Sequence, residues 1–144
     1  MDAAIAHATP EDLGPVLVLL AEASLPEDGV AEHFEHFLVV RADGRVVGAV
    51  GMEPYGESAL LRSLVVAPER RGHGLGLALT EQLLREARER GVRRVFLLTD
   101  TAAEFFPKFG FKRIPREEAN GEVQGSVEFR MACCESAVCM RLDL

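Results

Sequence analysis

The chain lacks tryptophan altogether and has a single tyrosine, so phenylalanine supplies nearly all of its aromatic side chains. It also lacks a long apolar run, because the longest one near the N-terminus, residues 16–21, is far too short to cross a bilayer. No basic segment precedes that run, as one would in a secretory signal. From these absences we expect a cytoplasmic protein with no membrane partner.

Cysteine is scarce and limited to Cys133, Cys134 and Cys139. An odd number outside a secretory context argues against a disulfide framework. Two interpretations are open: small buried apolar residues, which is usual for free cysteine, or a thiolate site for a metalloid. We favour the first, because adjacent cysteines in an extended segment point to opposite faces. The histidines lack the spacing of zinc ligands, so we predict no metal site.

The composition is that of one soluble globular domain over residues 1–144, with 48% hydrophobic and 27% charged residues. The formal net charge of -7 argues against nucleic acid as a partner, because that binding depends on basic patches. Arg70, Arg71 and His73 are a local exception, and such a cluster concentrates attraction for anions at one loop. For Arg70 alone we prefer the simpler interpretation of a solvated surface charge.

Hydrophobic periodicity and turn residues predict a chain of alternating strands and helices. Thr9 followed by Pro10 is typical of a helix start. The buried face of that helix should consist of Leu13, Val16, Leu17, Leu20 and Ala21. Asp43-Gly44 is typical of a tight hairpin turn, and Pro107 predicts a distorted or late-starting helix. The expected strands are residues 3–8, 37–41, 46–52, 58–66, 92–99, 111–114 and 137–142.

Three further segments have less regular patterns. Residues 30–36 suggest a second helical piece, and Pro54-Tyr55-Gly56 suggests a turn. Residues 115–127 are polar and contain glycine, so we expect a surface excursion over the site.

The most informative stretch is residues 60–91, where an apolar strand, a glycine-rich basic loop and an amphipathic helix follow one another. The first turn of a helix has unpaired N–H groups and a partial positive charge, so it attracts anions. Gly72, Gly74 and Gly76 carry no side chain that would keep a phosphate away from those donors. An ordinary glycine-rich turn before a helix is the alternative, and the glycines alone do not decide between them.

Other phosphate-binding motifs fit this loop less well. The dinucleotide fingerprint G-x-G-x-x-G requires a third glycine where the chain has Leu77 or Leu79, depending on where the count begins. A P-loop requires Gly-Lys followed by Ser or Thr, which the chain does not contain.

The spacing Arg71-x-x-Gly74-x-Gly76, preceded by Leu64-x-Val66-x-Pro68, resembles the acyl-coenzyme-A-binding motif of the GNAT superfamily of N-acetyltransferases. The segment from Phe105 to Phe111 is similar to that family's Phe-Tyr-x-x-x-Gly-Phe segment. The resemblance covers roughly residues 3–114.

The resemblance implies an α/β (α+β) fold: a mixed, mostly antiparallel sheet of six to seven strands with about four flanking helices, splayed between its two central parallel strands. It implies acetyl-coenzyme A as cosubstrate, with a backbone N–H near Leu64 to Val66 polarising the thioester carbonyl. We therefore assign a catalytic role to the Leu64 backbone. The implied cosubstrate-binding residues are Leu64, Val65, Val66, Arg71, Gly72, His73, Gly74, Leu75, Gly76 and Phe106.

An amine acceptor must lose a proton, and Glu53 is our candidate base. The alternative is a solvated carboxylate at a strand end, and Glu57 and Glu104 are weaker candidates. Many family members have a tyrosine where this chain has Phe106, so here either water or another group protonates the leaving thiolate, or the thiolate leaves unprotonated. Tyr55 falls in the expected turn, and we interpret it as structural.

The acceptor is suggested by a second, less specific resemblance. Residues 61–64 and 127–140 are similar to a GNAT branch associated with arsenic resistance, which implies a small amino acid with a second acidic group. Arg62 could hold such an anion, with Ser63 as a minor partner. Alternatively, Arg62 points to solvent or pairs within the sheet. Rival functions are acetylation of a protein or peptide amine and non-catalytic sensing of acyl-coenzyme A, and a homodimer is a further expectation.

Overall fold

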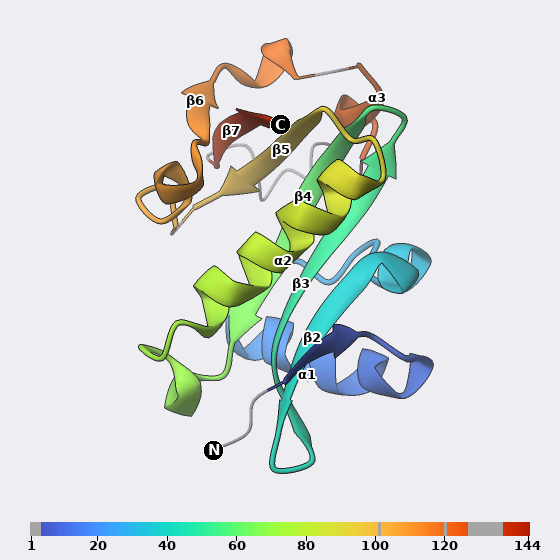
Figure 1. The fold of residues 1–144 in the computed structure, drawn as a ribbon, viewed down its shortest axis with the longest axis vertical. Coiled ribbons are helices and arrows are strands. Elements are labelled where there is room, and N and C mark those ends of the chain that lie inside the picture. The colour runs from blue at the N-terminus through green and yellow to red at the C-terminus, as the bar shows by residue number, and fades with distance from the viewer. Residues whose placement is uncertain (1–3, 101, 120, 127–136) are drawn as a thin grey trace. The chain divides into compact units, whose positions relative to one another are not determined.

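The computed structural model describes residues 4–100, 102–119, 121–126 and 137–144 (Figure 1). The helices are α1 (Leu13–Glu22), α2 (Leu75–Glu89) and α3 (Gly121–Gln124). The strands are β1 (Ala4–His7), β2 (Phe37–Ala42), β3 (Arg45–Tyr55), β4 (Ser58–Val66), β5 (Arg94–Thr99), β6 (Lys112–Ile114) and β7 (Val138–Asp143). Each expected strand is therefore confirmed, with boundaries that differ by at most three residues.

The strands form a seven-stranded sheet in the order β1-β2-β3-β4-β5-β7-β6. β4 pairs with β5 in parallel, whereas β1 with β2, β2 with β3, β5 with β7 and β6 with β7 pair antiparallel. The parallel pairing is short and joins Ser58–Leu60 to Arg94–Phe96. The expected mixed, mostly antiparallel sheet is confirmed.

The residues group into two compact units. Unit 1 contains Met1–Met52 and Arg62–Glu86, and unit 2 contains Glu53–Leu61 and Ala87–Leu144.

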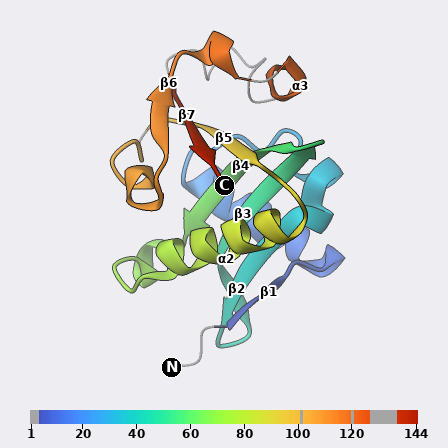
Figure 2. The same cartoon turned by 45° about the horizontal axis from the view of Figure 1, so that its top comes forward.

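In unit 1, β2 and β3 form the predicted hairpin, whose turn residues Asp43 and Gly44 have left-handed φ angles of 55° and 74°. α2 crosses in front of β3 in both ribbon views (Figures 1 and 2). Glycine at position 48 allows this packing, because a Cβ there would lie 3.3 Å from the Leu79 side chain of α2. Gly51 has an even closer neighbour, the Phe37 ring, 2.2 Å from the place of a Cβ.

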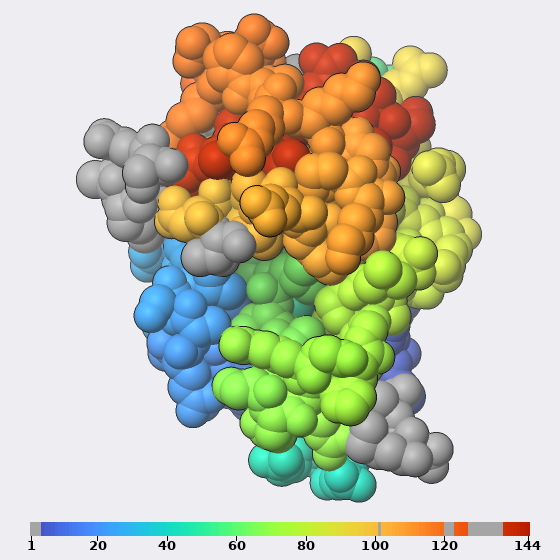
Figure 3. All heavy atoms as spheres, turned by 90° about the vertical axis from the view of Figure 1, so that its left-hand side faces the viewer, coloured from blue at the N-terminus to red at the C-terminus, as the bar shows by residue number. Residues whose placement is uncertain are grey.

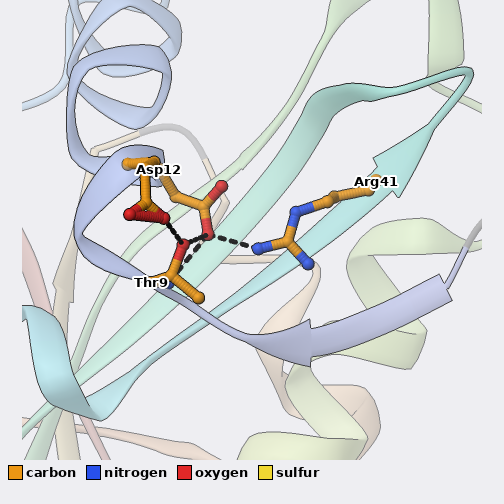
Figure 4. Close-up of polar contacts among 4 residues, drawn as sticks. Thr9, Asp12 and Arg41 are labelled. Atoms are coloured by element: carbon orange, nitrogen blue, oxygen red, sulfur yellow. Dashed lines mark hydrogen bonds and ion pairs between the residues drawn. The ribbon is translucent and has the colours of Figure 1, made fainter.

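The start of α1 is anchored to β2 by a buried carboxylate (Figure 4). A 3-10 turn at Pro10–Asp12 precedes the helix, and the Thr9 N–H donates to Asp12 Oδ2 over 2.8 Å. Arg41 of β2 donates to the same oxygen. Burial opposes ionisation of Asp12, but the Thr9 backbone bond, Arg41 and the Thr9 hydroxyl together outweigh it and lower the pKa of this carboxyl.

The buried face of α1 is rotated relative to the prediction. Val16, Leu19 and Leu20 are buried, Leu13 and Leu17 are half-buried, and Ala21 is exposed. The expectation for Ala21 was wrong and Leu19 was missed, because the helix packs with the side that carries residues 16, 19 and 20. The helical piece expected over residues 30–36 is a 3-10 helix, Ala31–His36.

In unit 2, the core cluster consists of Leu60, Phe96, Ala119 and Val123. Ala119 and Val123 fall in the segment 115–127, so the expectation of a surface excursion was wrong for these two residues. A 3-10 turn at Arg116–Glu118 and the short helix α3 bring Ala119 and Val123 onto the strand residues Leu60 and Phe96. Two apolar side chains among many polar ones carry no periodic signal.

Two turns in unit 2 also bear on the predictions. The distorted helix expected at Pro107 is a 3-10 helix, Phe106–Phe109, which ends at Gly110 with φ 100°. Pro54 and Tyr55 belong to β3, so the turn expected there was placed too early and falls at Gly56, with φ 67°. In the described part of the chain, no helix is long and apolar enough to cross a membrane.

Candidate active site

The candidate site in unit 1 begins with an irregularity inside β4. Ser63 has a φ angle of 62°, which is unusual for a residue with a side chain and is rare in a strand. A left-handed non-glycine residue costs about 1 to 2 kcal/mol. Such strained residues persist only where their surroundings hold them, and they cluster at functional sites.

After Ser63, one hydrogen bond shows which residues of β4 direct their backbone N–H and C=O groups toward β3 and which direct them away from it. The Ala67 N–H donates to the Val47 carbonyl of β3 over 2.8 Å. Because successive residues of a strand direct their N–H and C=O groups to opposite sides, Leu64 and Val66 direct theirs away from β3. Leu64 and Val66, two of the residues that the sequence assigned to the cosubstrate, therefore share one edge of β4, whereas the Val65 carbonyl faces β3.

Gly48 of β3 lies directly beside the part of β4 that carries Leu64 to Val66. A Cβ at that position would lie 3.2 Å from the Val65 carbonyl oxygen, so glycine lets the two strand backbones approach closely.

The loop that follows β4 is open to solvent. Gly72 and Gly74 have left-handed φ angles of 84° and 80°, and an added Cβ at either would meet no heavy atom within 4 Å. These glycines are therefore required by the backbone conformation and leave the space above the loop clear. In the space-filling view, the light-green spheres of this loop lie on the surface (Figure 3).

Helix α2 begins directly at this loop. The Ala78 N–H donates to the Gly74 carbonyl over 3.0 Å, which makes Gly74 the residue that precedes the first turn. The N–H groups of Leu75, Gly76 and Leu77 are then the first-turn donors that have no partner within the helix. They have the polarity that an anion requires.

The arginines of the loop have different partners. Arg70 Nη2 lies 2.7 Å from Asp43 Oδ2 in the β2–β3 turn, so an ion pair compensates its charge. The interpretation of Arg70 as a merely solvated charge was therefore wrong. Arg71 Nε donates to the Val66 carbonyl over 3.1 Å, and both Arg71 and His73 are exposed. Arg71 is thus fastened beside the edge of β4 that carries Leu64 and Val66.

Arg62 and Ser63 are both buried, with exposed fractions of 2% and 8%. Arg62 Nε donates to Ser63 Oγ over 3.0 Å, and Arg62 Nη2 donates to the Pro26 carbonyl over 3.3 Å. The sequence left open whether Arg62 binds the acceptor, points to solvent or pairs within the sheet, and its burial shows that it does not point to solvent. The sequence contains no signal for the Pro26 contact, because the partners lie 36 positions apart.

Glu53 belongs to unit 2 and is 1% exposed. The Tyr55 hydroxyl donates to Glu53 Oε1. The alternative of a solvated carboxylate at a strand end was therefore wrong. Sequence reasoning missed this pair, although residues two apart in a strand lie on the same face and the spacing was visible.

Phe106 also belongs to unit 2, and its ring is buried. It packs edge-to-face against Phe105 and Phe111, with centroids 5.1 Å and 5.6 Å away. These contacts give Phe106 a packing role, and its role toward the cosubstrate stays a prediction.

Of the three cysteines, Cys133 and Cys134 lie outside the described residues. Cys139 is buried in β7, and burial raises the pKa of its thiol to about 11. Such a thiol is almost entirely protonated near neutral pH and is a poor nucleophile. Within residues 4–100, 102–119, 121–126 and 137–144, no group of three or more His, Cys, Asp or Glu is arranged to hold a metal ion.

The comparison with known families decides the identity of the chain. Residues 5–111 match the model of the Acetyltransferase (GNAT) family. The chain belongs to the GNAT acetyltransferase family. The match includes the strand, loop and helix described above, together with the whole segment from Phe105 to Phe111.

Two relatives of this GNAT protein are similar over most of its length. It is 36% identical over 108 residues to an amino-acid acetyltransferase of Mycobacterium tuberculosis, covering 74% of this chain and 58% of the relative. It is 33% identical over 115 residues to the uncharacterized N-acetyltransferase CT2212 of Chlorobaculum tepidum, covering 77% and 74%. The chain thus spans a little over half of the first relative.

Solved structures share the fold of this GNAT protein. Rv2747 of M. tuberculosis, crystallised with CoA, has a TM-score of 0.82 at 24% identity and covers 98% of this chain and 99% of its own. N-acetylglutamate synthase of Neisseria gonorrhoeae, complexed with coenzyme A and N-acetyl-glutamate, has a TM-score of 0.85 at 20% identity, covering 100% and 35%. At these identities the likeness establishes the fold, and the expected fold is confirmed.

Proposed function

We propose that this protein transfers the acetyl group of acetyl-coenzyme A to the primary amine of a small, amino-acid-like acceptor by direct attack. The observation that carries the proposal is the sequence of features along unit 1. A strained residue in β4 is followed by an edge with the Leu64 and Val66 backbone groups and then by an open glycine loop at the start of α2. All of these features lie within residues 5–111, which match the GNAT family model.

The loop is proposed to hold the pyrophosphate of the cosubstrate. The backbone N–H groups from Arg71 to Gly76 supply the donors, and glycine at positions 72 and 74 leaves their approach clear. The Arg71 N–H also donates to the Pro68 carbonyl over 3.4 Å, so the groups that follow it are the main donors. Arg71 adds a positive charge beside them, while the charge of Arg70 is already compensated by Asp43. His73 is an exposed neighbour of the same donors.

The edge of β4 is proposed to hold the pantetheine arm and the thioester. Leu64 and Val66 direct their backbone groups to this side, and Val65 lies between them. The Leu64 N–H donates to the thioester carbonyl oxygen and stabilises the negative charge that develops there during attack. Holding the two reactants at attack distance supplies much of the remaining rate enhancement.

Glu53 is proposed to accept the proton of the attacking amine, directly or through water. Its support is its burial and the ordered hydroxyl partner, Tyr55. Phe106 has no hydroxyl, so coenzyme A leaves as a thiolate, which the ordinary thiol pKa of about 8.5 permits.

For the acceptor we propose an amino acid with a second acidic group. The M. tuberculosis relative is an amino-acid acetyltransferase, which supports an amino-acid acceptor. The sequence assigned the second acidic group to Arg62, but its bonds to Ser63 and the Pro26 carbonyl favour a structural use of this side chain. The resemblance of residues 61–64 and 127–140 to the arsenic-resistance branch makes an arsonic or phosphinic acid a candidate for that second group. A homodimer and a cytoplasmic location stay predictions.

The test has two stages. Titration calorimetry with acetyl-coenzyme A and with coenzyme A should detect binding to the purified protein. Release of free thiol is then followed with a panel of amines that includes glutamate, its arsonic and phosphinic analogues, and a peptide with a free amino terminus. Binding without thiol release from any amine would indicate a sensor, and preference for the peptide would replace the small acceptor. Absence of binding would contradict the proposal as a whole.

A further inference from the structure

The side chains of Arg62 and Ser63 meet at the strained position of β4. Ser63 has a left-handed φ angle of 62°, and Arg62 Nε donates to its hydroxyl oxygen over 3.0 Å. We propose that Arg62 is a positioning residue: its bond to Ser63 holds the left-handed backbone at this point and thereby sets the direction of the Leu64 N–H. The structural part of this inference stands on unit 1 alone, and its kinetic part rests on the proposed function.

The arginine is held in one orientation. Its Nη2 donates to the Pro26 carbonyl, so the planar guanidinium has defined contacts on more than one nitrogen. Both side chains are buried, and water therefore competes little for the Arg62–Ser63 bond. A serine side chain fixed in this way disfavours rotation of its own backbone toward the extended conformation.

Release of Ser63 would have a direct effect on the next residue. Strand residues alternate in the edge that their backbone groups face, and a left-handed residue interrupts this alternation. In the observed conformation, the Ala67–Val47 hydrogen bond implies that the Leu64 backbone groups point away from β3. If residue 63 relaxed into the extended region, Leu64 would turn toward the other edge, as after a one-residue shift in register.

This role makes a specific prediction about glycine at position 63. Glycine adopts the left-handed conformation without a side chain to strain it, whereas alanine retains the strain and loses the hydroxyl. With glycine at position 63, the left-handed backbone conformation depends less on Arg62. Activity should therefore rank serine first, then glycine, then alanine.

The experiment compares Ser63→Ala, Ser63→Gly, Arg62→Met and the double variant Arg62→Met/Ser63→Gly. We expect Ser63→Ala and Arg62→Met each to lower kcat about tenfold and Ser63→Gly about threefold, with KM for the acceptor unchanged. The double variant should recover to the kcat of Ser63→Gly alone. A rise in the acceptor KM of Arg62→Met that glycine does not reverse would overturn the inference and make Arg62 an acceptor ligand.

A second measurement separates this inference from the proposed function. In ¹⁵N-labelled protein, the Leu64 amide resonance should move in Ser63→Ala and stay close to its wild-type position in Ser63→Gly. This comparison needs no turnover, so it decides the inference even if the wild type proves inactive. An unmoved Leu64 resonance in Ser63→Ala would overturn it. If Arg62→Met does not fold, Arg62→Lys, which keeps the charge and loses the Nε donor, takes its place in both measurements.

Discussion

Arg70 and Asp43 form an ion pair that ties the loop before α2 to the turn between β2 and β3, with Nη2 and Oδ2 2.7 Å apart. Arg45 and Glu69 make a second, longer contact of 3.7 Å between the same two segments. The hairpin turn is thus a support for the proposed pyrophosphate loop. Its left-handed Asp43 is the residue that reaches the arginine.

Asp43→Asn should weaken the binding of acetyl-coenzyme A, because the loop loses one of its attachments. The carboxylate is exposed, so the effect should be modest, about two- to fivefold in Kd. Calorimetry measures it directly. Asp143→Asn, which removes another exposed carboxylate paired with an arginine, is the matched control and should leave the Kd unchanged. Equal affinities of wild type, Asp43→Asn and Asp143→Asn for acetyl-coenzyme A would show that the hairpin turn does not support the pyrophosphate loop.

Arg71→Ala should raise the Kd for acetyl-coenzyme A about tenfold, since it removes a cation beside the proposed phosphate donors. The difference between wild type and variant should shrink as salt is added, because exposed charges are screened. Arg85→Ala, on the exposed side of α2, serves as the control for loss of one positive charge. A salt dependence identical in wild type and Arg71→Ala would contradict the assignment.

Glu53→Gln should flatten the acidic limb of the pH–rate profile, because an amide cannot accept the proton of the amine. The measurement is kcat/KM against pH with the best acceptor of the panel. Glu57→Gln tests a nearby carboxylate that is exposed and should keep the wild-type limb. An unaltered limb in Glu53→Gln would exclude Glu53 as the base.

Asp12 should make folding stability depend on pH. The pKa of this carboxyl is lower in the folded protein than in the unfolded chain, so its contribution is present above the unfolded value and lost as pH falls through the folded value. At neutral pH, Asp12→Asn should therefore lower the free energy of unfolding by about 1 to 3 kcal/mol. The difference should shrink as the pH falls below the ordinary pKa of aspartate and disappear once the pH is below the lowered pKa of the folded state.

Denaturant unfolding of wild type and Asp12→Asn, at pH 7 and at successively lower pH, measures this effect. Asp143 also has a lowered pKa, owing to its bond with Arg141, but it is exposed. Asp143→Asn should therefore change stability little at any pH. A constant difference between wild type and Asp12→Asn across the pH range would contradict the assignment of the Asp12 cluster.

Gly51→Ala should destabilise the protein by about 1 to 3 kcal/mol, because its methyl group would overlap the Phe37 ring. Gly14→Ala is the matched control within α1, where an added Cβ meets nothing within 4 Å. That change should stabilise by about 0.5 to 1 kcal/mol, since alanine is the better helix former. Thermal unfolding of both variants checks the opposite signs, and equal shifts would contradict the packing of Phe37 on Gly51.

The sequence alone determined the order of strands and helices, including β4, the open loop and α2. These features depend on local causes: the period of apolar residues, the turn glycines, and the proline that distorts the helix at 106–109. The family motif lies in the same stretch, so the proposed cosubstrate residues were also predictable. Each of these signals lies within a few consecutive residues.

Only the tertiary structure decided which residues far apart in the chain contact one another. It buried Arg62 against Ser63 and Pro26 and paired Arg70 with Asp43. It also brought Ala119 and Val123 into a core with Leu60 and Phe96. Apart from the adjacent Arg62 and Ser63, these partners are far apart in the chain. Their contacts depend on how strands and loops pack in three dimensions, and no pattern of neighbouring residues encodes that packing.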